Sequence, residues 1–127
     1  MKFLIDTHTL LWWLDSPNLL GKTALGLMSD PGNAFLVSPV LPWELSIKAN
    51  KHQLPTGDLL TNFHAVMRRN RFTVIGVDPL HAIRSGLLPF HHRDPFDRLL
   101  AAQSLEMNIP LISRDAVFDR YGVHRIW

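Results

Sequence analysis

The chain has 127 residues, of which 46% are hydrophobic and 19% are charged, a balance typical of one ordinary globular domain. It contains no cysteine, which excludes a disulfide framework and a zinc site built from thiolates. Its formal charge is only +2, so charge alone neither requires nor excludes a nucleic-acid partner. The apolar run at residues 10–14 is flanked by acids, and we therefore expect no signal peptide, no membrane partner and a cytoplasmic protein.

Strand-like and helix-like segments alternate along the chain. In order, the sequence predicts a strand at 2–5, helices at 7–14 and 19–28, a strand at 34–37, helices at 41–50 and 59–69, a strand at 72–77, helices at 80–86 and 96–107, and strands at 109–113 and 123–127. The strands are apolar throughout, which is typical of a parallel sheet covered on both faces. We expect an α/β fold with a parallel sheet of about four to five strands, helices on both faces and a single domain over residues 1–127.

Two acids stand directly after predicted strands. Asp6 ends the first strand and Asp115 follows the fourth. In an open parallel sheet the functional site lies beyond the carboxyl ends of the strands, so both are candidate site residues. Each also fits a helix cap, because an aspartate at a helix start accepts hydrogen bonds from unpaired backbone N–H groups.

Two further acids fall in the first turns of predicted helices. Glu44 follows Pro42 and precedes Lys48 by four residues, so a simple helical ion pair is the alternative to a functional role. Asp97 follows Asp94 and Pro95. We expect Asp94 to be the N-cap, because a proline after it suits the first helical position.

Taken together, these acids favour a metal site. The topology brings Asp6, Glu44, Asp97 and Asp115 to one edge of the sheet, where like charges raise one another's pKa and a divalent cation offsets that cost. A carboxylate set without cysteine suits Mg²⁺ or Mn²⁺. Such a site serves phosphoryl chemistry, in which the metal activates water and stabilises charge on the phosphate.

Four segments in order resemble the PIN-domain ribonucleases, and among them the VapC-type toxins of prokaryotic toxin–antitoxin systems. The segments are Asp6-Thr7-His8 with the pair Trp12-Trp13, then Trp43-Glu44-Leu45, then the run from His92 to Gln103, and finally Leu111-Ile112-Ser113-Arg114-Asp115. The resemblance covers essentially the whole chain.

The resemblance implies a metal-dependent endoribonuclease. It assigns the catalytic metal ligands to Asp6, Glu44 and Asp97, with Asp115 as an outer ligand, and it lets Thr7 and Ser113 hold the acids by hydrogen bonds. Asp94, one helical turn before Asp97, could also approach the metal, although we favour its role as N-cap. It further implies an RNA substrate, a cognate antitoxin as inhibitor and a homodimer. The competing hypothesis is a non-enzymatic α/β signalling or protein-binding module with an acidic pocket.

The remaining polar and aromatic residues have plainer interpretations. We expect Lys48 and Arg98 to form surface ion pairs, although either could touch the scissile phosphate. We expect His91 and His92 to be an exposed loop pair, with RNA contact as the alternative. His8 fits no zinc spacing. The four tryptophans are expected in the core or in a dimer interface rather than as base-stacking platforms: Trp12, Trp13, Trp43 and Trp127.

Overall fold

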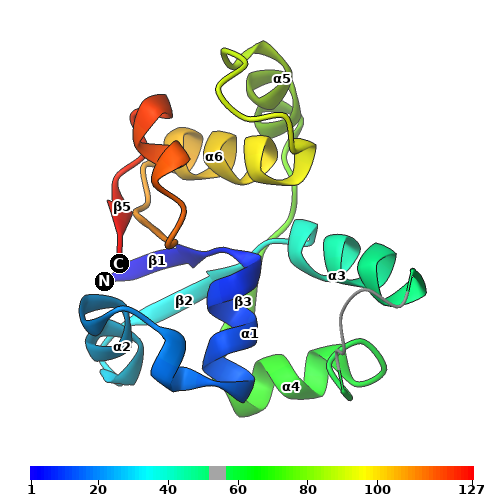
Figure 1. Cartoon of the computed structure of the whole chain (residues 1–127), viewed down its shortest axis with the longest axis vertical. Coiled ribbons are helices and arrows are strands. Elements are labelled where there is room, and N and C mark those ends of the chain that lie inside the picture. Colours follow the sequence, from blue (N-terminus) through cyan, green and yellow to red (C-terminus); the bar gives the residue numbers. More distant parts are fainter. Residues whose placement is uncertain (52–56) are drawn as a thin grey trace.

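The computed structural model describes residues 1–51 and 57–127 and places five parallel strands in one sheet (Figure 1). The strands are β1 (Lys2–Ile5), β2 (Ala34–Val37), β3 (Phe72–Val74), β4 (Leu111–Ile112) and β5 (Arg125–Ile126), in the order β3-β2-β1-β4-β5. Every neighbouring pair is parallel. The predicted α/β class and parallel sheet are confirmed.

Helices connect the strands. They are α1 (Thr7–Asp15), the 3₁₀ helix η1 (Pro17–Leu19), α2 (Lys22–Ser29), α3 (Val40–Asn50), α4 (Phe63–Arg69), α5 (Pro79–Leu87), α6 (Pro95–Met107) and the 3₁₀ helix η2 (Ala116–Tyr121). Crossover connections between parallel strands are right-handed, so connections that run in opposite directions across a sheet lie on opposite faces. In Figure 1, α1, α2 and α4 lie below the sheet, and α5 and α6 lie above it.

The order of the strands reverses at β1. The chain moves outward from β1 through β2 to β3, then returns to place β4 on the other side of β1. The backbone N–H of Asp6 donates to the carbonyl of Ile112 at 3.2 Å, which ties the two strand ends together. Ligands of open α/β sheets bind beyond the strand ends at such a reversal. The fold therefore places Asp6 and the residues after Ile112 at the favoured position for a site.

The core lies on both faces of the sheet. Phe3, Leu4 and Ile5, three consecutive residues of β1, are each 1% exposed or less, which is possible only when both faces of the strand are covered. Leu41 and Leu45 of α3 and buried residues of α6 pack into the same cluster. Within the described residues, no helix is long and apolar enough to cross a membrane.

Several predicted boundaries were wrong by a few residues. The helix predicted at 19–28 begins only at Lys22, because Pro17–Leu19 form the separate turn η1. The helix predicted at 59–69 begins at Phe63. Leu59 belongs to the preceding turn, but it is buried, so its place in the apolar pattern resembled that of a helical residue. The strand predicted at 72–77 ends at Val74, although the N–H of Ile75 still donates to Val37 at 3.0 Å.

The two strands near the C-terminus are also shorter than predicted. The run at 109–113 pairs only over Leu111–Ile112, and the run at 123–127 only over Arg125–Ile126. The sequence predicted no helix between these two strands, whereas the structure has η2 there. Short 3₁₀ helices leave no amphipathic period to detect.

Candidate active site

Asp6 lies where β1 passes into α1, and it is both a helix cap and a buried acid. Its Oδ1 accepts from the N–H of Thr9 at 2.8 Å, and its Oδ2 accepts from the Ser113 hydroxyl at 2.5 Å. Burial raises the pKa of Asp6, and the hydrogen bonds from Ser113 and Thr9 only partly oppose this. The predicted role of Ser113 as a hydrogen-bond donor is confirmed, and its bond joins the ends of β1 and β4.

Glu44 lies in the first half of α3 with 6% of its surface exposed. Its Oε1 accepts from the Thr7 hydroxyl at 2.6 Å, and its Oε2 lies 3.1 Å from Nζ of Lys48. The expected contact of Thr7 with a pocket acid is confirmed, and so is the helical pair with Lys48. These contacts fix the rotamer of a carboxylate that would otherwise be costly to bury.

Asp97 is the most perturbed acid of the site. It lies in the first turn of α6, which begins after Asp94, and Asp94 is the N-cap as predicted because its Oδ1 accepts from the N–H of Phe96 at 2.8 Å. Burial, followed by the negative charges of Asp94, Glu44, Asp6 and Asp115, raises the pKa of Asp97 to about 8. Asp97 therefore lies in the combined field of the other acids.

Asp115 caps η2 through Oδ1, which accepts from the N–H of Val117 at 3.0 Å. Its other oxygen, Oδ2, lies 3.5 Å from Nε2 of His92, and the same nitrogen lies 3.0 Å from Oδ2 of Asp97. Ligand atoms of His92, Asp97 and Asp115 all lie within 4.8 Å of one another. Among the described residues, Asp6 and Glu44 lie outside this group, and their link to Asp97 is electrostatic.

His92 lies in the loop before α6, as expected, but the expectation that it is exposed was wrong. Its side chain is 22% exposed and faces two of the acids. The ring Nδ1 of His92 accepts a hydrogen bond from the backbone N–H of Asp94 at 3.0 Å. The backbone N–H of His92 donates to Oη of Tyr121 at 2.8 Å. The available sequence signal was a histidine two residues before an N-cap aspartate, but the contact with Tyr121 spans 29 residues and leaves no local pattern.

Arg98 is not a surface residue, which corrects the expected surface ion pair. It is 6% exposed, and its guanidinium donates to the carbonyls of Pro89, Ser85 and Leu88 at 2.8–2.9 Å. These carbonyls belong to the end of α5 and the residues after it, where helices leave acceptors unpaired. Arg98 thus holds α5 to α6 and does not neutralise the acids.

Trp43 stands at the edge of the site. It is 58% exposed and therefore lies outside the core, so of the two expected places only a dimer interface stays a prediction; its ring meets the Phe96 ring edge-on at 4.8 Å. Trp43 directly precedes Glu44 in the sequence, and Phe96 directly precedes Asp97. The other three tryptophans pack against the core, as expected: Trp12, Trp13 and Trp127.

The donor set fits a hard divalent cation. The acids offer carboxylate oxygens, which are the ligands that Mg²⁺ and Mn²⁺ prefer. Burial first, and then the charges of four neighbouring acids, raise the pKa of Asp97 to about 8, and a bound cation would offset the repulsion among these acids. The protein's own cations offset it only in part, because Lys48 pairs with Glu44 whereas Arg98 contacts carbonyls.

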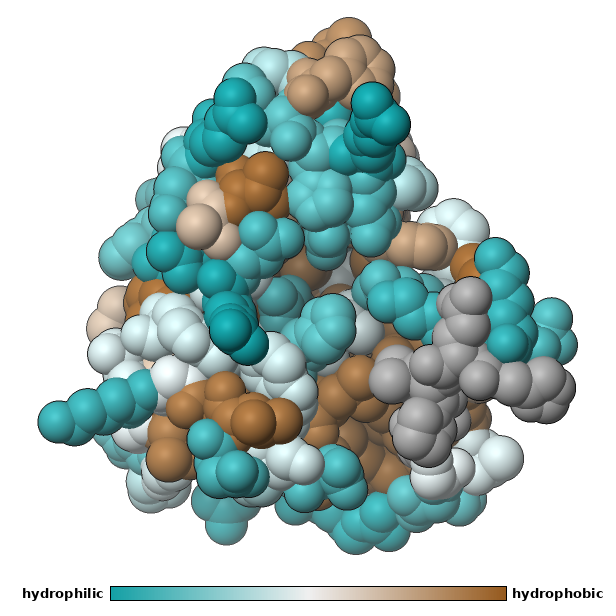
Figure 2. Space-filling model, in the orientation of Figure 1, coloured by the Kyte–Doolittle hydropathy of each residue, from teal (hydrophilic) through white to brown (hydrophobic). Residues whose placement is uncertain are grey.

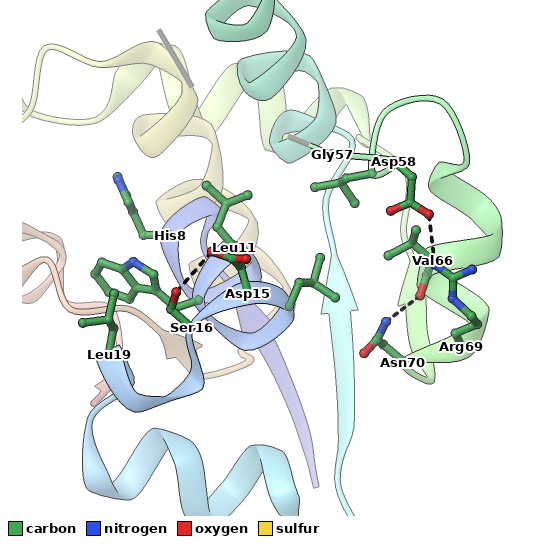
Figure 3. A pocket seen from close by; sticks show the side chains of 13 residues that line it. His8, Leu11, Asp15, Ser16, Leu19, Gly57, Asp58, Val66, Arg69 and Asn70 are labelled. Atoms are coloured by element: carbon green, nitrogen blue, oxygen red, sulfur yellow. Dashed lines mark hydrogen bonds and ion pairs between the residues drawn. The ribbon is translucent and has the colours of Figure 1, made fainter. Parts of the chain in front are cut away.

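A separate cavity of about 760 Å³ lies between α1 and α4 (Figure 3). Its lining is mixed: Leu11 and Val66 are apolar, whereas the Arg69 guanidinium lies 3.3 Å from Asp58 at the rim. Figure 2 shows hydrophobic side chains gathered in a hollow in this region. His8, two residues after Asp6, also lines this cavity, and its ring lies 5.4 Å from that of Trp12.

The comparisons with known proteins agree on one fold. The sequence model of the PIN domain matches residues 3–123. The chain is similar to a chain of VapBC2 from Rickettsia felis bound to a promoter DNA fragment, with TM-score 0.70, 14% identity and coverage of 99% of this chain and 98% of that chain. It is also similar to a chain of VapBC-5, a toxin–antitoxin system from Mycobacterium tuberculosis, with TM-score 0.59, 16% identity and coverage of 98% and 95%.

A third similar structure is FitAcB from Neisseria gonorrhoeae, with TM-score 0.63, 14% identity and coverage of 98% of this chain and 96% of that chain. No curated protein matches the sequence. At these identities the solved structures support the fold, and the roles of individual side chains have to be argued from their chemistry.

Proposed function

The chain belongs to the PIN-domain family, and we propose that it is a metal-dependent endoribonuclease that acts as the toxin of a toxin–antitoxin pair. The observation that carries the proposal is the placement of Asp97, whose pKa is raised to about 8 by burial and by the four surrounding acids. Clustered carboxylates destabilise a metal-free protein because they repel one another, and the same negative charge attracts a cation to the site.

We assign the metal ligands to the carboxylates of Asp6, Glu44 and Asp97, with Asp115 as an outer ligand. When bound, Mg²⁺ or Mn²⁺ would lower the pKa of a water molecule and stabilise the charge that develops on a phosphate. The hydroxyls of Ser113 and Thr7 orient Asp6 and Glu44 in advance, which reduces the reorganisation that binding requires.

The reaction is hydrolysis of an RNA phosphodiester. The oxygen of a water molecule gives up a proton to solvent and attacks phosphorus, the bond from phosphorus to the leaving sugar oxygen breaks, and the leaving oxygen takes up a proton from solvent. The charge of the chain supports an anionic polymer as substrate. If the four site acids are set aside, seven acids stand against 13 basic residues, and the rest of the chain carries a formal +6. A basic surface around an acidic site attracts the backbone while the cation attracts the scissile phosphate.

Cleavage of RNA by the purified protein tests the assignment of Asp6. We expect cleavage with Mg²⁺ or Mn²⁺, and we expect EDTA or the substitution Asp6→Asn to remove it, because an amide is a much weaker ligand for a hard cation. Asp30→Asn is the matched control, since Asp30 is an exposed turn residue whose Oδ1 accepts from Gly32, a bond that an asparagine oxygen can replace.

RNA cleavage by the wild type in EDTA, or by the Asp6→Asn variant at the wild-type rate, would contradict the assignment of the metal ligands. The competing hypothesis, a non-enzymatic protein-binding module, would gain if the wild-type protein bound a partner but cleaved no RNA with either ion. Circular dichroism of each variant separates loss of the site from loss of the fold.

An antitoxin is the partner that we propose for the toxin. The similar solved structures include VapBC and FitAB complexes, which were crystallised with DNA or named as toxin–antitoxin systems. We propose a cytoplasmic location, because an endoribonuclease of this kind would find its RNA substrate there. Growth on induction is the corresponding test: wild type should arrest cells, Asp6→Asn should not, and co-expression of the protein encoded beside it should relieve the arrest.

We propose that α5 forms the interface of a homodimer. Leu80, Ile83, Leu87 and Phe90 are 58%, 58%, 80% and 86% exposed, and spacings of three and four residues place the three helical ones on one face. A contiguous exposed apolar surface of this kind marks an interaction site, and a two-fold dimer buries the same surface on both copies.

The substitution Ile83→Asp is expected to convert a dimer into a monomer, because it places a carboxylate in the middle of this apolar surface. The fold should survive, since Ile83 is 58% exposed. Light scattering after gel filtration measures the mass. Leu25→Asp on α2, at 36% exposure, is the matched control and should leave the mass unchanged. A monomeric wild type, or a dimeric Ile83→Asp, contradicts the proposal.

A further inference from the structure

The imidazole of His92 lies between two acids of the proposed site. Its Nε2 is 3.0 Å from Oδ2 of Asp97 and 3.5 Å from Oδ2 of Asp115. Asp97 belongs to α6 and Asp115 precedes η2, so one ring connects acids from two elements that are separated in the chain. Nothing in the resemblance or in the comparisons assigns this residue a role.

The other ring nitrogen determines where the proton of the imidazole lies. Nδ1 accepts a hydrogen bond from the backbone N–H of Asp94 at 3.0 Å. A backbone N–H can only donate, so Nδ1 must present its lone pair. In the neutral ring the proton then lies on Nε2, which faces the acids as a donor. His92 therefore cannot offer an Nε2 lone pair to a metal ion while the bond from Asp94 persists.

The backbone holds the ring in this place. The N–H of His92 donates to Oη of Tyr121 at 2.8 Å, and the preceding His91 packs its ring 5.1 Å from the Tyr121 ring. Tyr121 is the last residue of η2, the helix that Asp115 caps. The loop before α6 is thus attached to η2. Hydrogen bonds restrain both the backbone N–H of His92 and Nδ1 of its ring.

We propose that His92 is a positioning residue that holds the carboxylates of Asp97 and Asp115 in place for a divalent cation through its Nε2–H and does not bind the cation itself. This inference rests on the proposed metal site. Carboxylates that bind metals are commonly oriented by hydrogen bonds from residues outside the ligand set. Because the ring donates, the ligand set contains oxygen alone, which favours Mg²⁺ or Mn²⁺ over zinc.

Binding of Mn²⁺ to the protein without RNA tests this role. Electron paramagnetic resonance of free Mn²⁺ gives the dissociation constant directly. His92→Phe keeps a flat ring without a donor and is expected to weaken Mn²⁺ binding about 10- to 100-fold. His92→Gln supplies an amide N–H and should recover most of the affinity. His91→Phe is the matched control, because it keeps the packing on Tyr121 and should bind as wild type does.

A second measurement uses the wild-type protein and does not depend on a variant that folds. Long-range ¹H–¹⁵N NMR identifies which ring nitrogen of His92 carries the proton, and we expect Nε2 to carry it both before and after Mg²⁺ is added. A shift of the proton to Nδ1 on addition of Mg²⁺ means that Nε2 has become a ligand, which overturns the inference.

The Mn²⁺ titration also distinguishes failure of the proposed metal site from failure of the proposed role of His92. If wild type binds no Mn²⁺ at all, the proposed function fails with the inference. If wild type binds Mn²⁺ and a folded His92→Phe binds it equally well or more tightly, only the positioning role of His92 fails.

Discussion

Asp97→Asn is expected to reduce metal-dependent RNA cleavage on the order of 1,000-fold while it raises the stability of the metal-free protein at pH 8. The two effects have one cause. Asp97 is a half-buried acid in the field of Asp94, Glu44, Asp6 and Asp115, and its ionised form is unfavourable without a cation. An asparagine of the same shape removes the charge that repels its neighbours and also the carboxylate that we assign to the metal.

Asp97 suits this test better than Asp6 does. Both oxygens of Asp6 accept hydrogen bonds, from Thr9 and from Ser113, so an amide there disturbs a cap and a link between strands. Oδ2 of Asp97 lies 3.0 Å from Nε2 of His92, and an asparagine oxygen can occupy the same place. Opposite changes in activity and stability are therefore attributable to the charge.

Urea denaturation with EDTA at pH 8 gives the stability, and cleavage of a labelled RNA gives the activity. Glu106→Gln is the matched control on the same helix. Glu106 lies near the far end of α6 and pairs with Arg84 at 2.8 Å, so its loss should leave cleavage unchanged and alter stability by about 1 kcal/mol or less. A metal-free Asp97→Asn that is less stable than wild type at pH 8 would contradict the electrostatic account.

The second large effect is the dependence of metal binding and of stability on pH. In the unfolded chain an aspartate titrates near its ordinary pKa of 3.8, whereas the pKa of Asp97 in the folded protein is about 8. Between these values the folded state holds more protons than the unfolded state does. The free energy of unfolding of the metal-free protein therefore falls as pH rises from about 4 to about 8, and this contribution is constant above pH 8.

Metal binding should show the opposite trend with pH. Below pH 8 the ion must displace the proton of Asp97, so the affinity for Mg²⁺ or Mn²⁺ is expected to rise about tenfold per pH unit up to about pH 8 and then to level off. At a free ion concentration 100-fold above the dissociation constant, the ion should stabilise the fold by about 2.7 kcal/mol.

Calorimetric titration with Mn²⁺ at pH 6, 7 and 8, in buffers of different ionisation enthalpy, measures both the affinity and the protons released. Thermal unfolding with and without the ion measures the stabilisation. An affinity that does not change between pH 6 and pH 8 would show that Asp97 is already ionised in the metal-free protein, in conflict with the raised pKa.

The sequence predicted the parts of this molecule that depend on local patterns. Apolar runs such as Phe3-Leu4-Ile5 identified buried parallel strands, because both faces of β1 are covered. Positions just after strands and at helix starts identified Asp6, Asp94 and Asp115, because caps and strand ends have short-range signals. The hydrogen bonds of Thr7 and Ser113 followed from the resemblance and are present in the structure.

The parts that the sequence did not predict depend on contacts between distant segments. His92 faces Asp97 and Asp115 because Tyr121, 29 residues away, accepts its backbone N–H. Arg98 has the appearance of a surface residue on a helix, yet it lies under the end of α5 and binds three carbonyls there. A polar side chain that satisfies groups of another element has no periodicity, and its burial becomes visible only when the elements are assembled.

We propose that the carboxylates at this edge of the sheet form a metal centre, and every role assigned above depends on it. Anomalous diffraction from crystals soaked in Mn²⁺ tests it most directly. We expect one strong anomalous peak within coordination distance of carboxylate oxygens of Asp6, Glu44 and Asp97, with Asp115 beside it and with Nε2 of His92 outside the ligand set. Absence of a peak there in a crystal that binds Mn²⁺ elsewhere, or a peak bound by Nε2 of His92, would contradict it.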